Sequence, residues 1–238
     1  MTNNFPHPKS VLVISAHPDD PEFGAAGTVA FLAKQGAEVV YVLVTDGSKG
    51  SAEPNMTKEK LIAMRQEEQK NAAKKLGVSK VVFLGQPDGE VRNTDELREL
   101  IVRQIRIHKP DVLFTHDPTS RIINNSYLNH TDHRVVGDTV LDSVFPLARD
   151  RLNFPKHEKE GLEPHKVLDV FLFFTNEPNY WVDISDTVQL KVAALQEHKS
   201  QIGDPNDLEE RILQRSRDRA EKVSFEHAEI FRRIQLPK

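Results

Sequence analysis

The chain has 238 residues, of which 38% are hydrophobic and 29% charged, enough apolar material for one sizeable core and a single domain over residues 1–238. Its 32 Lys and Arg residues against 36 Asp and Glu residues give a formal net charge of -4, which argues against nucleic acid as a partner because phosphate binding over an extended surface needs a basic surplus. Cysteine is absent, which excludes disulfides, thiolate nucleophiles and Cys-based zinc sites, so any metal must bind His, Asp or Glu.

Membrane and secretion signals are not evident in the sequence. No apolar run approaches the roughly 18 residues that a membrane-spanning helix needs, and residues 1–6 lack the basic and apolar regions of a secretion signal. We therefore expect a cytoplasmic protein that works without a membrane partner.

Short apolar runs rich in β-branched residues alternate along the chain with longer segments of helical period. The predicted strands are 11–16, 39–45, 81–84, 112–115 and 167–174, and the predicted helices between them are 24–35, 58–76, 94–108 and 132–145. Apolar strands that alternate with helices are typical of a parallel sheet with both faces covered and right-handed crossovers. The sequence therefore predicts a Rossmann-like, doubly wound α/β fold with a mostly parallel sheet.

The remaining segments are polar. Residues 150–166 contain two prolines and one glycine and predict a surface loop, with a lid as one interpretation. Residues 187–199 and 207–222 have helical character, and the second is charged enough to predict a solvated surface helix.

The expected strand order brings together two loops that carry histidine and acidic residues. In the common order 3-2-1-4-5 the first and fourth strands are neighbours where the winding reverses, and ligands bind in the crevice at their carboxyl ends. The loop after the first strand begins at His17, and the loop after the fourth runs from His116 to His130. We expect both loops to line this crevice, His116 included.

The first loop carries His17-Pro18-Asp19-Asp20-Pro21-Glu22. Asp and Pro are ordinary turn and cap residues, and carboxylates are favoured at a helix N-terminus, so this segment alone leaves a purely structural interpretation open. That interpretation leaves the adjacent imidazole unexplained.

The second loop ends in His130-Thr131-Asp132-His133. Asp132 as a helix cap between two surface histidines is again an open alternative. Taken together, the two segments supply two imidazoles and a carboxylate, the usual ligands of a catalytic zinc site that keeps one position open.

A dinucleotide site is the main rival for this crevice. Gly24 and Gly27 follow the first strand, and Asp46 ends the second where an acid that binds ribose would lie. The glycine spacing departs from G-x-G-x-x-G, however, and the carboxylates of the first loop place negative charge where a pyrophosphate needs free amides. The crevice therefore favours a cation.

These residues resemble the PIG-L/LmbE-like zinc-dependent deacetylases, which remove acetyl groups from compounds that carry N-acetylglucosamine (GlcNAc). The family's A-H-P-D-D-x-E motif corresponds to Ala16 to Glu22 and its H-x-D-H motif to His130 to His133, with weaker matches along most of the chain. The resemblance implies a zinc-dependent hydrolase that removes the N-acetyl group from a small GlcNAc conjugate or a chitooligosaccharide.

The resemblance also implies roles for single residues. His17, Asp20 and His133 would hold Zn²⁺, with Fe²⁺ as an alternative, and Asp19 would act as general base. From the residues alone, Asp19 and Asp20 could exchange these roles. A protonated His130, held by Asp132, would stabilise the oxyanion.

Substrate binding depends more heavily on the resemblance. Arg65 alone could simply pair with a neighbour on its helix, and Asp88 alone suggests a tight turn, but the resemblance favours substrate contacts for both. Glu22 could support a ligand imidazole or only the helix N-terminus, and His198 could pair with Gln201 at the surface or lie in the crevice.

Three further expectations complete the interpretation. The resemblance implies a homo-oligomer, a trimer or a hexamer. The alternatives in function are a metal-dependent amidase for a larger acyl group and a non-enzymatic module that binds a sugar or a nucleotide. The remaining histidines are expected in solvent or loops: His7, His108, His157, His165 and His227.

Overall fold

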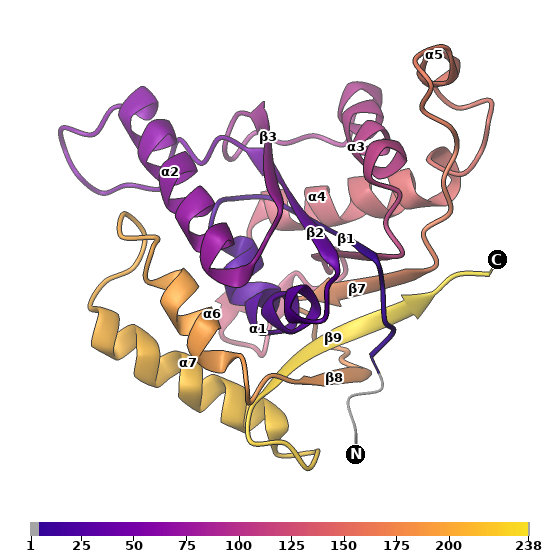
Figure 1. The fold of residues 1–238 in the computed structure, drawn as a ribbon. Coiled ribbons are helices and arrows are strands. Elements are labelled where there is room, and N and C mark those ends of the chain that lie inside the picture. The colour runs from indigo at the N-terminus through magenta and orange to yellow at the C-terminus, as the bar shows by residue number, and fades with distance from the viewer. Residues whose placement is uncertain (1–4, 238) are drawn as a thin grey trace.

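A seven-stranded sheet runs through the middle of the molecule in the order β3-β2-β1-β4-β7-β9-β8 (Figure 1). The computed structural model describes residues 5–237. The strands of this sheet are β1 (Ser10–Ser15), β2 (Glu38–Thr45), β3 (Lys80–Gln86), β4 (Val112–His116), β7 (Asp169–Phe173), β8 (Tyr180–Asp183) and β9 (Ala228–Gln235). The strands from β3 to β7 run parallel, whereas β9 pairs antiparallel with β7 and β8. The predicted doubly wound, mostly parallel sheet is confirmed, with β7 as the fifth strand of the order 3-2-1-4-5.

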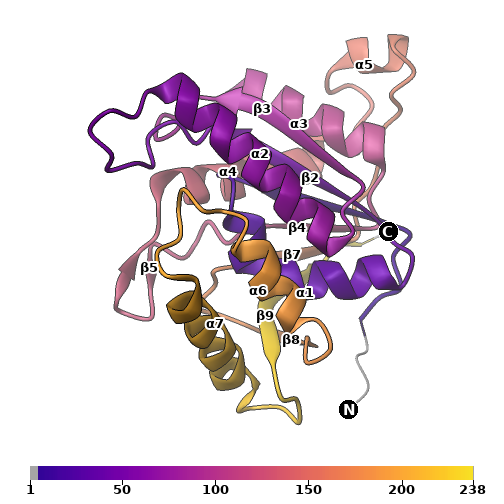
Figure 2. The same ribbon diagram turned by 60° about the vertical axis from the view of Figure 1, so that its left-hand side comes forward.

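Helices cover both faces of the sheet, as Figures 1 and 2 show. They are α1 (Asp20–Lys34), α2 (Lys58–Leu76), α3 (Asp95–His108), α4 (Thr131–Asp142) continued by η1 (Ser143–Leu147), α5 (Pro155–Lys159), α6 (Val188–Leu195) and α7 (Pro205–Ala220). Successive side chains of a strand point to opposite faces. Val11 and Val13 of β1 therefore pack with α1, α2 and α6, while Leu12 and Ile14 pack with α3 and α4. Along the described chain, no helix combines the length and apolar character needed to cross a membrane.

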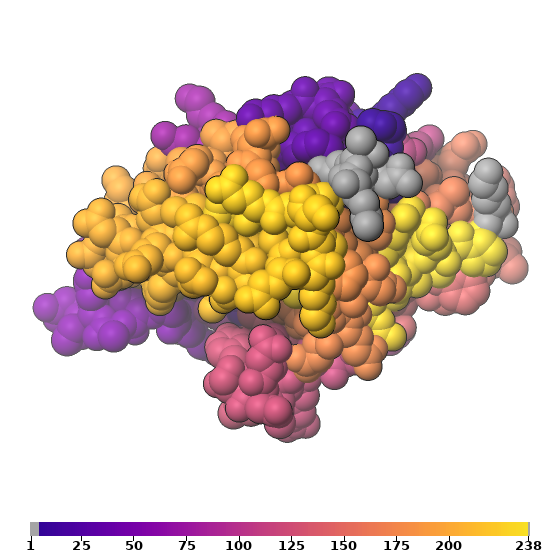
Figure 3. Space-filling view, turned by 90° about the horizontal axis from the view of Figure 1, so that it is seen from below, coloured from indigo at the N-terminus to yellow at the C-terminus, as the bar shows by residue number. Residues whose placement is uncertain are grey.

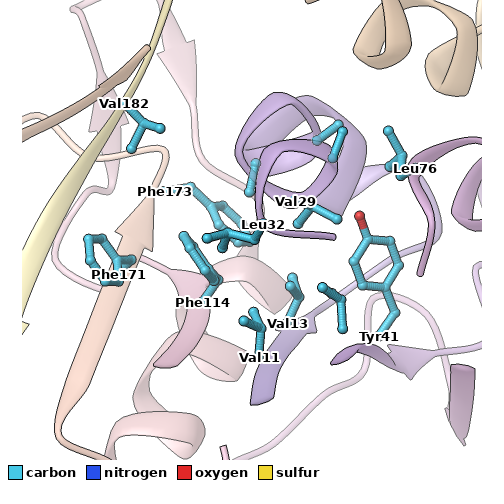
Figure 4. Packing of buried hydrophobic residues seen from close by; sticks show 14 of the residues in the cluster. Val11, Val13, Val29, Leu32, Tyr41, Leu76, Phe114, Phe171, Phe173 and Val182 are labelled. Atoms are coloured by element: carbon cyan, nitrogen blue, oxygen red, sulfur yellow. The ribbon is translucent and has the colours of Figure 1, made fainter. Parts of the chain in front are cut away.

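Two glycines allow α1 to approach the sheet closely. A Cβ atom added at Gly24 would lie 2.8 Å from the ring of Phe173 on β7, and one added at Gly27 would lie 2.8 Å from Ile184. Figure 4 shows Phe173 and Leu32 of α1 as members of the same core cluster. The glycines that suggested a dinucleotide site therefore serve helix–sheet packing.

Several elements differ from the predicted ones. α1 begins at Asp20, four residues before the expected start, so two acids of the first motif lie in its first turn. Strands β8 and β9 and the hairpin of β5 (Ile122–Ile123) and β6 (Tyr127–Leu128) lie outside the predicted elements. His157 is buried on α5, so its expected place in solvent or a loop was wrong. His227 lies in the loop before β9, as expected, although its side chain is buried.

The polar segment 150–166 lies near the amino ends of the strands. The buried guanidinium of Arg106 on α3 donates to the backbone carbonyl of Asp150 (3.2 Å), and His165 Nε2 donates to the carbonyl of Pro110, just before β4 begins (2.9 Å). The crevice is at the opposite, carboxyl end of β4. The lid interpretation of this segment is therefore wrong.

Candidate metal and catalytic site

The first motif forms a tight turn between β1 and α1. The backbone N–H of His17 donates to the Asp20 carboxylate (2.7 Å), which closes the turn. Asp19, the N-cap residue of α1, has a φ of 91° and thus a left-handed conformation that costs free energy when a side chain is present. The turn aims these side chains at the carboxyl edge of the sheet.

The second motif meets the first because β1 and β4 are neighbours. The Nδ1 atom of His17 lies 3.3 Å from Nε2 of His133 and 3.3 Å from Oδ2 of Asp20, and His133 Nε2 lies 3.0 Å from Oδ1 of Asp20. Ligand atoms in a tetrahedral zinc site with bonds of about 2.0–2.1 Å are about 3.3–3.4 Å apart. The three predicted ligands are thus spaced to share one ion.

The other nitrogens of both imidazoles contact oxygen atoms. Nδ1 of His133 lies 2.9 Å from Oδ1 of Asn129, whose amide group is oriented by a backbone carbonyl. Nε2 of His17 lies 3.2 Å from Oδ1 of Asp88 and 3.3 Å from Oδ2 of Asp132. Metal-binding histidines commonly donate their second N–H to such acceptors, which orients the ring and leaves the facing nitrogen free for the metal.

The electrostatics of this cluster also favour a cation. Burial alone would lower the pKa of His17, but hydrogen bonds with Asp132, Asp20 and Asp88 outweigh it and raise this pKa to about 12. The Oδ1 atom of Asp132 is buried and has no partner among residues 5–237. A metal would supply the positive charge in place of the proton, since a ligating imidazole is neutral. Imidazole and carboxylate donors suit zinc and also Fe²⁺.

Asp19 lies beside this cluster and lines a cavity. Its carboxylate is 3.4 Å from Nη2 of Arg65, and its backbone N–H donates to Oε1 of Gln69 (3.0 Å). Burial raises the pKa of Asp19 to about 6, against the lowering effect of Arg65. Asp19 is thus held by its backbone while its carboxylate faces the cavity.

The cavity has a volume of about 990 Å³ and opens from the cluster. Aromatic side chains contribute to its wall: Phe23, Tyr127, Phe174 and Trp181. The hairpin of β5 and β6, at one side of the cavity, projects from the surface in Figure 3. The size and the aromatic wall of the cavity suit a small molecule with sugar-like dimensions.

The comparison with known families identifies the two motifs. The model of the PIG-L family, described as GlcNAc-PI de-N-acetylase, matches residues 12–144, and this span holds both motifs. The chain belongs to the PIG-L family.

Relatives with described activities share most of this chain. It is 37% identical to the diacetylchitobiose deacetylase of Thermococcus kodakarensis, over 84% of this chain and 72% of the relative. It is 26% identical to a probable N-acetyl-α-D-glucosaminyl L-malate deacetylase 2 of Bacillus anthracis, over 81% of each chain. The solved N,N'-diacetylchitobiose deacetylase of Pyrococcus horikoshii, in complex with its inhibitor MPG, matches with a TM-score of 0.88 and 32% identity, over 96% of this chain and 84% of that one.

His130 of the second PIG-L motif lines the cavity but is not held as expected. Its Nδ1 accepts the backbone N–H of Asp132 (3.1 Å), whereas the Asp132 carboxylate is 3.9 Å away and accepts the N–H of Gly89 (2.7 Å). Burial and the nearby charge of His17 lower the pKa of His130. A neutral ring whose Nδ1 is an acceptor carries its proton on Nε2. The expected protonated His130 supported by the Asp132 carboxylate is therefore replaced by a neutral donor that a backbone amide orients.

His116 does not line the cavity. It is fully buried, its Nε2 accepts the N–H of Ala16 (3.0 Å), and its ring stacks on His133 with centroids 4.2 Å apart. Burial lowers its pKa to about 3, so the ring is neutral. The substrate-binding prediction for His116 was wrong because the strand end turns this side chain behind the cluster, where it joins Asp20 and His133 in a second group of possible ligand atoms.

Arg65 and Asp88 line the cavity, but other parts of the protein already engage their polar atoms. Arg65 donates to the backbone carbonyls of Pro18 (2.7 Å) and Gly47 (3.1 Å), and Asp88 contacts His17. Both residues thus stabilise loops of the PIG-L motifs. Contacts between these two residues and substrate stay a prediction.

A buried chain of polar side chains behind Asp19 was not predicted. Gln69, which holds the Asp19 amide, donates to Glu22 (2.9 Å), and Glu22 lies 3.1 Å from Nε2 of His198. Burial opposes the charged imidazole, but Glu22 raises the pKa of His198. Glu22 therefore pairs with His198 and does not support a ligand imidazole. A sequence signal existed, since Gln69 lies four residues after Arg65 and hence on the same helix face.

Proposed function

We propose that this protein is a metal-dependent N-deacetylase that acts on a small GlcNAc-containing molecule, a GlcNAc conjugate or a chitooligosaccharide. The observation that carries the proposal is the convergence of the two PIG-L motifs, whose candidate ligand atoms lie 3.0–3.3 Å apart at the edge of the cavity. The activities named for the relatives support the same reaction class.

In this proposal His17, Asp20 and His133 hold the metal, which we take to be Zn²⁺ with Fe²⁺ as the alternative. Bound zinc lowers the pKa of water from about 15.7 to about 7 and polarises the amide carbonyl. Asp88, Asp132 and Asn129 orient the two ligand imidazoles through their second nitrogens.

Two side chains that face the cavity would carry the proton transfers and stabilise the developing charge. Asp19, with a pKa of about 6, takes a proton from the attacking water and returns it to the departing amine. His130 donates a hydrogen bond from Nε2 to the acetyl oxygen as negative charge develops there, a contact worth roughly 2.7–4 kcal/mol in other enzymes. The strained backbone of Asp19 fixes the direction of its carboxylate before substrate binds.

Acetate release and metal content, measured on the same purified sample, test this function. We expect about one metal ion per chain and release of acetate from GlcNAc, diacetylchitobiose or a charged GlcNAc conjugate, lost on chelation and restored by Zn²⁺ or Fe²⁺. N-propionyl and N-butyryl analogues separate a deacetylase from an amidase for larger acyl groups. A metal-loaded protein that releases acetate from none of these substrates contradicts the proposal.

Two expectations accompany the proposal without supporting it. A trimer or hexamer stays a prediction that sedimentation of the purified protein would test. The cytoplasmic location likewise stays a prediction, which fractionation of the producing cells would test.

A further inference from the structure

Three basic side chains of α7 and the turn after it line the same cavity as the metal cluster. Arg215, Arg219 and Lys222 are four and three residues apart, so they lie on one face of the helix. In Figure 3 this part of the chain, in gold, forms a broad surface near the projecting hairpin of β5 and β6, in pink. None of the three residues belongs to either PIG-L motif.

None of these three cations forms a salt bridge with another described residue. Among residues 5–237, no carboxylate oxygen lies within 4.0 Å of the charged nitrogens of Arg215, Arg219 or Lys222. Arg219 is half-buried, and burial lowers its pKa against the raising effect of Glu229. The Glu229 carboxylate already accepts hydrogen bonds from Lys191 and three other donors. A partly desolvated cation without a partner costs free energy that a bound anion would recover.

Simpler explanations account for less of this arrangement. Basic residues stabilise the C-terminal end of a helix, and both Arg217 and Arg219 are in the last turn of α7. The helix end does not explain why three cations line the cavity while Arg217 does not. One carboxylate, Asp218, lines the same stretch of the cavity wall, and it accepts a hydrogen bond from Gln214 (2.7 Å).

The charges of the cavity are therefore divided between two places. The acids Asp19, Asp20 and Asp88 belong to the metal cluster, where His17 and Arg65 already face them. The α7 wall keeps a positive excess after Asp218 is counted. A ligand that places its acetamido group at the cluster and an anionic group at α7 would match both places.

We propose that the α7 wall is a subsite for an anionic group, a carboxylate or a phosphate, carried by the substituent of the GlcNAc unit. This inference rests on the proposed deacetylase function and narrows its substrate to charged GlcNAc conjugates, in preference to neutral chitooligosaccharides. Complementary charge that does not touch the reacting bond acts mainly on substrate capture and hence on kcat/KM.

The test compares charged and neutral substrates that share the same sugar. The charged probes are GlcNAc 1-phosphate and the carboxymethyl glycoside of GlcNAc, which separate a phosphate from a carboxylate, and the neutral probes are the methyl glycoside and diacetylchitobiose. We expect kcat/KM to be about tenfold or more higher for a charged probe than for the methyl glycoside at low salt, with the advantage shrinking as ionic strength rises.

Variants of α7 then assign the preference to the wall. Arg219→Gln should lower the ratio of charged to neutral kcat/KM by about tenfold, mostly through KM, and Lys222→Gln should lower it less because Lys222 is exposed. Arg217→Gln is the matched control, because it removes the same charge from the same helix turn on a face that does not line the cavity.

The possible results separate this inference from the proposed function. Equal kcat/KM for charged and neutral substrates in the native protein, or an equal effect of Arg217→Gln and Arg219→Gln on the ratio, overturns the subsite while leaving the deacetylase intact. If no substrate releases acetate, the deacetylase fails. Calorimetric binding of GlcNAc 1-phosphate to native and Arg219→Gln protein still decides the subsite in that case, and unchanged binding overturns it.

Discussion

Two regions along the sheet, the central strands and the region around β9, are stabilised by different means. Strands β1, β2 and β4 are apolar and buried on both faces, and helices cover them on each side. Beyond β7 in the strand order, β9 is only partly buried and carries charged residues among its apolar ones. The first region bears the candidate metal cluster. The second region supports α1, the helix that begins at this cluster.

A buried ion pair makes the connection between the two regions. Nζ of Lys191 on α6 lies 2.6 Å from the carboxylate of Glu229 on β9, which also accepts the backbone N–H groups of Gly27 (3.0 Å) and Thr28 (2.8 Å) inside α1. Because α1 begins at Asp20, this pair fixes the helix whose first turn supplies a candidate metal ligand. The site therefore depends on a region that supplies none of its candidate metal ligands.

The largest effect is expected from the two central side chains of the first motif. His17→Ala should lose the metal, and Asp19→Ala should keep it while its turnover falls by about 10²–10⁴, the usual contribution of a general acid–base residue. Metal analysis and acetate release on each variant distinguish the two roles. The reverse pattern, with metal lost from Asp19→Ala alone, would exchange the roles of ligand and base.

Next in size is the effect of breaking the buried pair between the two regions. Lys191→Met leaves the Glu229 carboxylate buried without its cation, which typically costs about 3–5 kcal/mol of unfolding free energy. Denaturant unfolding measures this loss, and Lys75→Met, which breaks the exposed contact with Glu197, should cost less than about 1 kcal/mol. Equal stability of the two variants would show that the Lys191–Glu229 pair does not hold the regions together.

The same contrast explains which parts of the fold could be predicted. Buried parallel strands are continuous apolar runs, so β1, β2 and β4 were evident, and their order placed the two motifs together. β9 reads Ala-Glu-Ile-Phe-Arg-Arg-Ile-Gln. Its Arg233 donates to Asp169 on β7 (2.7 Å), and its Arg232 lies 2.9 Å from Glu177 in a loop. Such a strand shows no continuous apolar run, and its pairing depends on contacts far away in the sequence.

Within the site, residue types were easier to predict than orientations. The motifs indicated His17, Asp20 and His133, but a side chain at a strand end can point into the crevice or behind it, and His116 points behind. Asp132 was expected to hold His130, yet its carboxylate contacts His17 because the Gly89 amide draws it in that direction. Periodicity gives the face of an element, whereas these choices depend on its neighbours.

A smaller effect is expected where α1 packs on the sheet. Gly24→Ala places a Cβ atom 2.8 Å from the ring of Phe173 on β7, and overpacking of this kind typically costs about 1–3 kcal/mol. Thermal unfolding measures the loss. Gly203→Ala is the control, because no atom lies within 4 Å of an added Cβ there. If both variants unfold at the native temperature, α1 has room to move and does not position Asp20 rigidly.

The smallest effect is expected from the polar chain behind the proposed base. Gln69→Leu removes the acceptor of the Asp19 N–H and the donor to Glu22, so the strained turn loses one of its supports while every candidate metal ligand remains. We expect kcat to fall about tenfold, within the range for residues that orient a site, with metal content and KM near native values. Gln66→Leu on the same helix controls for the loss of a glutamine from α2. A loss of metal equal to the loss of kcat would show that Gln69 supports the ligands instead of Asp19, and an unchanged kcat would show that the turn holds its left-handed conformation without this contact.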